Sequence, residues 1–372
     1  MTDATVRHFP TEVLEQPEAL ERTDAYLADA LDGGARELLS GIDRVIWTGS
    51  GDCYFIGTAV AAFFERISGV PSSAIESYDF VTATPALTER TLVIGFSSSG
   101  KSVYAVEAID VARARGARTL AITNTGTNRL AEAADVSLTT QAGRSFSFPS
   151  KTTTSALLTG LRLAEAAASS KGIGVQPVSI DELVGAVNSA LEHASSPAQS
   201  VAGRVSAARR VVVVGSGLGR SAALIGAAKL IETSGIAASA NNSEEFLHLI
   251  GFGIQEVDVV VVIDDGNLRS RLVAQYAVRQ GAVTIVVTAD SSSTDIPQEA
   301  RVIQSFGGDD VARLFADLAV LHTLAVAVSA NRGTNPDIPT GVDLDYVIGL
   351  LYTDPVDGWN EEAAKGLVDV AD

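Results

Sequence analysis

The chain has 372 residues, of which 46% are hydrophobic and 19% charged, a balance typical of a soluble globular protein with enough core for two domains. A formal net charge of -18 repels nucleic acid at long range, so we expect no nucleic-acid partner. The single cysteine excludes an internal disulfide, and the four histidines show no metal-ligand spacing with it, so we expect no metal and no cofactor.

The segment at residues 1–40 is predicted to form a helical arm, with helices between Glu12 and Leu39 that pack on the first domain. Its opening residues lack both the basic start and the apolar core of a signal peptide. The longest apolar runs, such as VDVVVVI at 257–263, are shorter than a membrane span requires. We therefore expect a cytoplasmic protein without a membrane segment.

The middle of the chain consists of two copies of one pattern, offset by 166 residues. The first copy begins at Arg44 with RVIWTGSGDCYFIG, and the second begins at Arg210 with RVVVVGSGLGRSAA. Each copy alternates strands, glycine turns and helices, which predicts an α/β fold of two tandem doubly wound parallel sheets, with ligand sites beyond the carboxyl ends of the strands. We place the first domain at 41–168, a linker with one helix at 169–200, the second domain at 201–335 and a C-terminal tail at 336–372.

Residues 95–102 read G-x-x-x-x-G-K-S, the pattern of the phosphate loop in ATP and GTP hydrolases. A buried strand is predicted before this loop and a helix after it, so backbone N–H groups and the helix dipole favour an anion there. The magnesium ligand of such a hydrolase would be Asp264, but Asp264 is the repeat counterpart of Ser97 and lies in the other domain. The pattern therefore favours a small phosphate ester, with a nucleoside triphosphate as the weaker alternative.

The two copies differ in the residues that carry chemistry. The second copy has Asp264 and Asp265 where the first has hydroxyl groups, and paired carboxylates would repel a phosphate. It also has Lys229 and Glu232, three residues apart and therefore on one helix face. A half-buried carboxylate beside an amine is a candidate proton shuttle, and an ordinary surface ion pair is the alternative.

Five motifs resemble the tandem SIS (sugar isomerase) family, which includes the isomerase half of glucosamine-6-phosphate synthase and the galactosamine-6-phosphate deaminase/isomerase group. They are TEVLEQPEAL (11–20), GSGDCYFIG (49–57), SSSGKS (97–102), GAAKLIETS (226–234) and RGTNPDIP (332–339). Two further stretches, GRSFSFPSKTTTS (143–155) and PDIPTGVDLDYVIGLLY (336–352), are more similar to the deaminase/isomerase group. The resemblance covers nearly the whole chain and implies two flavodoxin-like SIS domains.

The resemblance also implies a role for individual residues. The 6-phosphate would be held by Ser97, Ser98, Ser99, Gly100 and Ser102, and the sugar by Gly51, Asp52, Cys53 and Ser150. Glu232 matches the base that moves a proton between C1 and C2, Lys229 matches a lysine beside it, and His248 matches the ring-opening histidine. One carboxylate can perform this transfer through an enediol or enolamine, while the remote phosphate supplies orientation.

Four features depart from the family pattern, and one of them is that a tail lysine of the synthases has no match near Leu344. His248 is followed by Leu-Ile where the family has Gly-Pro, which affects ring opening. Asp52 replaces a threonine and either favours an amino or hydroxyl sugar or caps the following helix. Lys101 replaces a glutamate and either adds charge to the phosphate site or lies in solvent.

The resemblance therefore implies a phosphosugar isomerase or deaminase that acts on an amino-sugar 6-phosphate without a glutaminase domain. The alternatives are a non-catalytic phosphosugar-binding regulator and a fructosamine-type phosphate deglycase. The resemblance further implies a homodimer with active sites near the subunit interface, where His248 acts in cis or in trans. Trp359 in the tail either anchors a cover over the cleft or lies in solvent.

Overall fold

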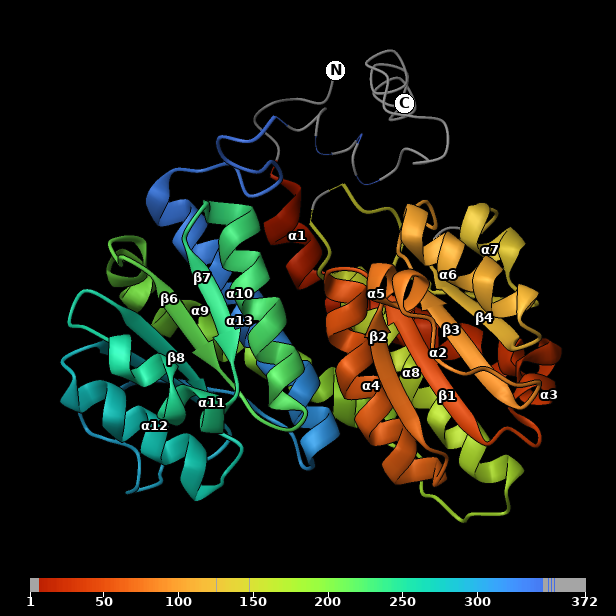
Figure 1. Cartoon of the computed structure of the whole chain (residues 1–372). Helices are drawn as coiled ribbons and strands as arrows, with labels where there is room; N and C mark the ends of the chain where they lie inside the picture. Colours follow the sequence, from red (N-terminus) through yellow and green to blue (C-terminus); the bar gives the residue numbers. More distant parts are fainter. Residues whose placement is uncertain are drawn as a thin grey trace. The chain divides into compact units, whose positions relative to one another are not determined.

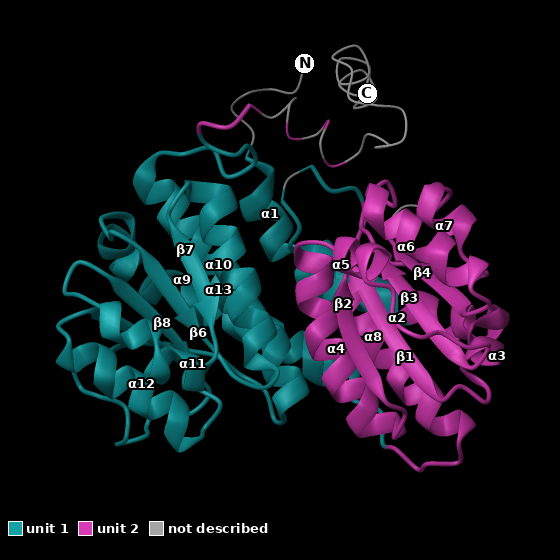
Figure 2. Ribbon diagram, viewed as in Figure 1, with its two compact units in different colours: residues 1–24, 144–155, 176–340 teal, residues 25–143, 156–175, 341–372 magenta. Residues whose placement is uncertain are grey.

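The computed structural model describes residues 7–343 apart from 125 and 147, together with residues 347, 349 and 351. Contacts divide the chain into two compact units, drawn in two colours in Figure 2. Unit 1 comprises residues 1–24, 144–155 and 176–340, and unit 2 comprises residues 25–143, 156–175 and 341–372. Each unit contains one parallel sheet, whose elements are labelled in Figure 1.

Unit 2 is built on a five-stranded sheet with the order β2-β1-β3-β4-β5. Its strands are β1 (Arg44–Gly49), β2 (Ser72–Glu76), β3 (Thr91–Phe96), β4 (Arg118–Thr123) and β5 (Val136–Thr139). Its helices are α4 (Asp52–Ser68), α5 (Ser77–Thr82), α6 (Val103–Ala114), α7 (Arg129–Ala133), α3 (Arg36–Leu39) and the distorted turn η1 (Leu31–Ala35). Helices α2 (Gln16–Ala30) and α8 (Lys151–Ser170) begin in unit 1 and continue in unit 2.

Unit 1 repeats this design with the order β7-β6-β8-β9-β10. Its strands are β6 (Val211–Val214), β7 (Ala238–Asn241), β8 (Val259–Ile263), β9 (Val283–Thr288) and β10 (Arg301–Gln304). Its helices are α1 (His8–Leu14), α9 (Ile180–Ser206), α10 (Gly219–Ser234), α11 (Ser243–His248), the 3-10 helix η2 (Ile250–Gly253), α12 (Leu268–Arg279) and α13 (Asp310–Arg332). The prediction of two doubly wound parallel sheets is thus confirmed.

Buried apolar strands and close glycine turns produce this fold. Strands β6 and β8 are runs of valine and isoleucine buried along their length, as expected where helices cover both faces of a parallel sheet. After β1 and β6 the next helix starts very close to the strand. A Cβ on Gly49 would lie 2.8 Å from the Cβ of Cys53 in α4, and one on Gly215 would lie 2.2 Å from the Gly219 carbonyl oxygen. The repeated glycines therefore permit the same strand-to-helix turn in both units.

Helix α13 forms the apolar centre of unit 1 and packs on α9 and α10. By length and composition it is the one helix among the described residues that could cross a membrane. However, 78% of its apolar window is buried within the fold, as is usual for the core helix of a soluble protein.

The N-terminal arm differs from its predicted position. The carboxylate oxygens of Asp337 accept hydrogen bonds from the backbone N–H groups of His8 and Phe9, each at 2.7 Å, so α1 is fixed to the end of unit 1. The arm up to Asp24 therefore belongs to the unit of the second sheet, and its expected packing on the first domain is wrong for this part. The helix predicted within the linker is α9, which continues to Ser206. Most of the predicted tail, including Trp359, lies outside the described residues.

Candidate functional site

The sheet of unit 2 has its switch point between β1 and β3. From β1 the chain continues to β2 on one side, and β3 pairs with β1 on the other. Ligands of doubly wound sheets bind where the loops after two such strands diverge. The loops here are the turn at 49–51 and the loop at 97–102, so the structure brings the predicted sugar turn and the predicted phosphate loop to one edge of the sheet.

The phosphate loop is held by backbone hydrogen bonds to its neighbours. The carbonyl oxygen of Ser98 accepts from the Asn124 N–H at 3.0 Å, and that of Gly100 accepts from the Leu130 N–H at 3.0 Å. Within the loop, the Gly100 N–H donates to the carbonyl and hydroxyl oxygens of Ser97, each at 3.1 Å. These bonds fix the loop before any ligand arrives.

The loop leads directly into the N-terminus of α6. Ser102 is the N-cap residue of α6 but makes no side-chain capping hydrogen bond. Because a helix N-terminus carries unsatisfied N–H donors and partial positive charge, this end suits an anion. Ser98 and Ser99 are half-buried beside it, and Lys101 is exposed. The exposure of Lys101 is compatible with both of its predicted roles.

The four residues predicted to line the sugar fall in both units. Gly51 is the N-cap of α4 with φ 56°, Asp52 is the first helical residue, and Cys53 is half-buried. Asp52 is therefore one position past the N-cap, where a carboxylate still interacts favourably with the helix dipole. Ser150 belongs to unit 1, is fully buried, and its hydroxyl has no hydrogen-bond partner among the described residues.

Sequence reasoning missed Glu76, which lies beside the sugar turn. The Ser50 hydroxyl donates to the Glu76 carboxylate at 2.6 Å, and the N–H groups of Tyr78 and Asp79 donate to its other oxygen at 2.8 and 3.2 Å. Partial burial acts to raise the pKa of Glu76, but these hydrogen bonds outweigh it and lower the pKa. The repeat was a usable signal, because the same place in the second copy holds Asn242, which also caps a helix.

Lys229 and Glu232 form an ion pair on α10, with Nζ and Oε2 2.6 Å apart. The Lys229 side chain is fully buried, whereas 29% of the Glu232 side chain is exposed. This geometry argues against an ordinary surface ion pair, because a buried ammonium depends strongly on its counter-ion. The Glu232 side chain is thus in contact with the lysine and also partly exposed.

Sequence reasoning also missed His322, which lies on α13 near this pair. Its Nδ1 is 3.1 Å from the Gln16 side-chain oxygen, and its Nε2 has no hydrogen-bond partner among the described residues. Burial, together with the charge of Lys229, lowers the pKa of His322 to about 3. The ring is therefore neutral, and the ion pair of Lys229 is with Glu232. Nothing in the sequence indicated that this histidine, which lies alone in an apolar helix, is buried near the ion pair.

His248 is the last residue of α11 and lies on a different element from the ion pair. Its side chain is 73% exposed, and Nε2 is 3.1 Å from the Glu244 carboxylate. The neighbouring Leu249 and Phe252 are exposed large apolar side chains. The predicted ring-opening histidine thus faces solvent at an apolar patch of unit 1.

The second copy of the phosphate loop contains its own carboxylate. Asp264 accepts hydrogen bonds from the Gly266 N–H at 3.1 Å, the Ser270 hydroxyl at 2.6 Å and the Thr288 hydroxyl at 3.0 Å. It is almost fully buried. The second copy thus buries a carboxylate at the position where the first copy has Ser97, and its negative charge disfavours an anion there. No group of metal-ligating residues occurs in the part of the chain that the structure describes.

Comparison with known proteins gives a consistent result. The family model of the SIS domain matches residues 38–169 and 205–327. A glutamine–fructose-6-phosphate aminotransferase (isomerizing) from Aeropyrum pernix is 27% identical over 342 residues, covering 88% of this chain but 55% of that protein. The chain therefore spans about half the length of this relative.

Two solved structures share the fold over most of the chain. The C-terminal domain of glucosamine-fructose-6-phosphate aminotransferase from Francisella tularensis has a TM-score of 0.81 at 20% identity, covering 91% of this chain and 100% of that one. Tagatose-6-phosphate ketose/aldose isomerase from Escherichia coli has a TM-score of 0.76 at 22% identity, covering 92% and 97%. At these identities the likeness establishes the fold.

Proposed function

The chain belongs to the SIS domain family, and from this premise we propose that it is a phosphosugar isomerase or deaminase acting on an amino-sugar 6-phosphate. The observation that carries the proposal is the Lys229–Glu232 pair, a buried ammonium joined to a carboxylate that is partly open to solvent. Such a carboxylate can accept and return a proton while the lysine keeps it oriented.

In the proposed reaction the open-chain aldose loses its C2 proton to Glu232 and regains a proton at C1. With a hydroxyl group at C2 the product is a ketose, and no atoms are gained or lost. With an amino group at C2 the product is an imine, which water hydrolyses to a ketose and ammonia. His248 would assist ring opening, and Lys229 would hold Glu232 in position.

The phosphate-binding role falls on Ser97, Ser98, Ser99, Gly100 and Ser102 in unit 2. Three features support this role: the loop is held by backbone hydrogen bonds, the N-terminus of α6 has no side-chain cap, and hydroxyl groups lie around it. Gly51, Asp52, Cys53 and Ser150 are proposed to line the sugar. The phosphate would supply binding energy and orientation without taking part in proton transfer.

The test is turnover of the full chain over a panel of hexose and hexosamine 6-phosphates in D₂O. We expect deuterium at C1 of the ketose product and, for amino sugars, release of ammonia. Glu232→Gln should lower turnover at least 100-fold, since general-base catalysis contributes about 10²–10⁴-fold. It should leave phosphate-ester binding within about threefold. A panel without turnover, or equal loss of binding and turnover in the variant, would count against the proposal.

The rival is a regulatory protein that binds a phosphosugar without turning it over. Thermal-shift titration with the same panel separates the two, because a ligand stabilises the folded state whether or not it reacts. Stabilisation without turnover indicates a regulator, and release of a free amine from a ketosamine phosphate indicates a deglycase. The intact Lys229–Glu232 pair favours an enzyme.

We further propose a cytoplasmic homodimer. The support is the exposed apolar patch formed by Leu249 and Phe252 beside His248, with Phe252 75% exposed. Replacement of Phe252 by Asp should shift the mass measured by light scattering from dimer to monomer. An unchanged mass would place any interface elsewhere.

A further inference from the structure

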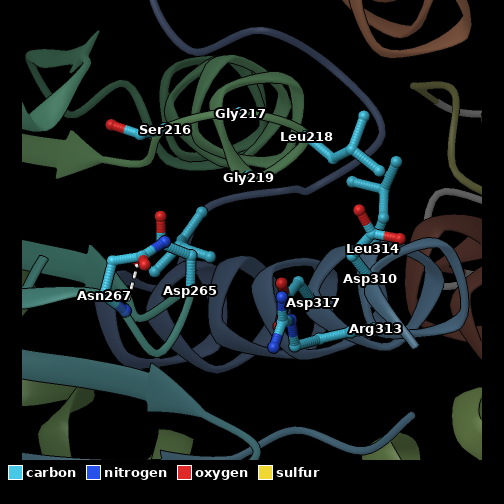
Figure 3. A pocket seen from close by; sticks show the side chains of 11 residues that line it. Ser216, Gly217, Leu218, Gly219, Asp265, Asn267, Asp310, Arg313, Leu314 and Asp317 are labelled. Carbon is cyan, nitrogen blue, oxygen red and sulfur yellow. Dashed lines mark hydrogen bonds between the residues drawn. The ribbon is translucent and has the colours of Figure 1, made fainter. Parts of the chain in front are cut away.

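Unit 1 contains a pocket at its own switch point, between the loops that follow β6 and β8. Its volume is about 180 Å³. The turn at 217–219, which leads into α10, forms one wall and the first turns of α13 form another (Figure 3). The volume suits a small ligand such as a monosaccharide.

The charges around the pocket are mainly negative. Asp265 from the loop after β8 and Asp310 and Asp317 from α13 line it, opposed by the single guanidinium of Arg313 (Figure 3). With all three carboxyl groups ionised, the lining carries two more negative than positive charges. This balance disfavours a phosphate ester and favours a cation.

Asp317 contributes a buried carboxyl group to the pocket. It is 3% exposed, it lines the pocket, and its Oδ1 accepts no hydrogen bond from the described residues. A buried carboxyl oxygen without a hydrogen-bond donor destabilises the folded state. A ligand that donates to this oxygen would remove the cost.

Burial raises the pKa of Asp317 to about 7, and the nearby Asp264 carboxylate acts in the same direction. The Ser305 hydroxyl and Arg313 oppose this shift. The carboxyl group is therefore close to its ionisation midpoint at neutral pH, so an arriving cation can displace its proton at little cost.

Two kinds of cation could meet these requirements, a metal ion and an organic ammonium. No set of three carboxylate, histidine or cysteine side chains in the described part of the chain converges as metal ligands do. An ammonium on a small molecule instead spreads three N–H donors, and neighbouring hydroxyl groups can reach Asn267 and the other carboxylates. We propose that this pocket binds a small polyhydroxylated amine, such as an unphosphorylated amino sugar.

The test is calorimetric titration of the full chain with glucosamine and with glucose, which has a hydroxyl group in place of the ammonium. We expect saturable binding of glucosamine at least tenfold tighter than glucose. Asp317→Asn and Asp310→Asn should each weaken it at least tenfold, whereas the exposed Glu256→Gln should not. If Asp317→Asn fails to fold, Asp310→Asn decides, because Asp309 and not Asp310 caps α13.

Three results would overturn the proposal: no saturable binding of glucosamine, equal affinity for glucose, or unchanged affinity in a folded pocket variant. Glu232→Gln separates this site from the proposed catalytic pair. Glucosamine affinity retained in Glu232→Gln supports a separate pocket, even if the proposed isomerase activity fails. Affinity lost in Glu232→Gln but kept in Asp317→Asn would assign the amine to the ion pair instead.

Discussion

At the scale of single residues, Gly100 determines whether the phosphate loop can form. Its φ of +66° lies in the left-handed region, and a Cβ there would meet the Asn128 side chain at 1.9 Å. Asn128 cannot move freely, because its oxygen caps α7 by accepting from the Ala131 N–H at 3.0 Å. The loop can therefore lie against the start of α7 only because residue 100 has no side chain.

Gly100→Ala should weaken phosphate binding while the chain still folds. Gly116→Ala is the matched control, because Gly116 has φ +81° but open space around its Cβ. Gly116→Ala should lose about 1–2 kcal/mol of unfolding free energy from the left-handed backbone, and Gly100→Ala should lose more, because its Cβ also displaces the Asn128 side chain. Titration with a sugar phosphate should show at least tenfold weaker binding for Gly100→Ala only. Equal affinities in the two variants would show that the loop does not hold the phosphate.

Asp317 predicts a pH dependence of stability. Its pKa rises from 3.8 unfolded to about 7 folded, so its favourable contribution is present below pH 3.8 and is lost as pH rises through 7. Asp317→Asn should therefore stabilise the chain more at pH 8 than at pH 5, by up to about 3 kcal/mol at 1.36 kcal/mol per pKa unit. Urea unfolding at the two pH values measures this difference. A pH-independent effect would contradict the buried carboxyl.

The sequence predicts features that a short local motif encodes, but not features that arise from packing between distant residues. The loop at 97–102 can be identified from the glycine and hydroxyl residues in a short stretch of chain. His322 meets Gln16 across 306 positions of sequence, and Asp317 becomes unusual only because α13 buries it beside a pocket. A single sequence contains no trace of such contacts.

At the scale of elements, the N-terminal arm shows what an amphipathic pattern leaves undetermined. The helices predicted between Glu12 and Leu39 are present, but the apolar face of a helix does not specify which domain it packs against. The partner of α1 is set by polar contacts. Asp337 accepts from the first N–H groups of α1, and Glu12 accepts from Ser145 and from the Phe146 N–H at 2.7 and 2.6 Å.

Asp337→Ala should therefore release α1 from unit 1. Loss of a capping carboxylate typically costs about 0.5–2 kcal/mol of unfolding free energy. The exposed Glu256→Ala, a surface change of the same kind, should stay within about 0.5 kcal/mol. Urea unfolding gives both values, and limited proteolysis should show cleavage before Gln16 only in Asp337→Ala. Equal protection of the two variants would mean that other contacts hold the helix.

At the scale of the whole molecule, one sheet topology occurs twice in the chain. The internal repeat predicts both sheets, because strand, glycine turn and helix recur in the same order. The compact units nevertheless exchange segments relative to the repeats, since 1–24 and 144–155 join unit 1. The sequence repeat predicts the order of strands and helices, whereas the boundaries of the compact units depend on contacts between distant segments.

The two copies have also diverged at their switch points. In unit 2 the loop at 97–102 offers hydroxyl groups, while in unit 1 a buried carboxylate, Asp264, stands at the corresponding position and further carboxylates line a pocket. We propose that the loop of unit 2 holds the phosphate and that the Lys229–Glu232 pair of unit 1 transfers the proton.

A crystal structure of the Glu232→Gln variant with glucosamine 6-phosphate tests this claim most directly, because the slowed variant retains the substrate. The account predicts the phosphate on the loop at 97–102, with the side chain at position 232 directed to C1 and C2 of the sugar. A phosphate bound against Asp265, or a sugar whose first two carbons lie away from position 232, would contradict it.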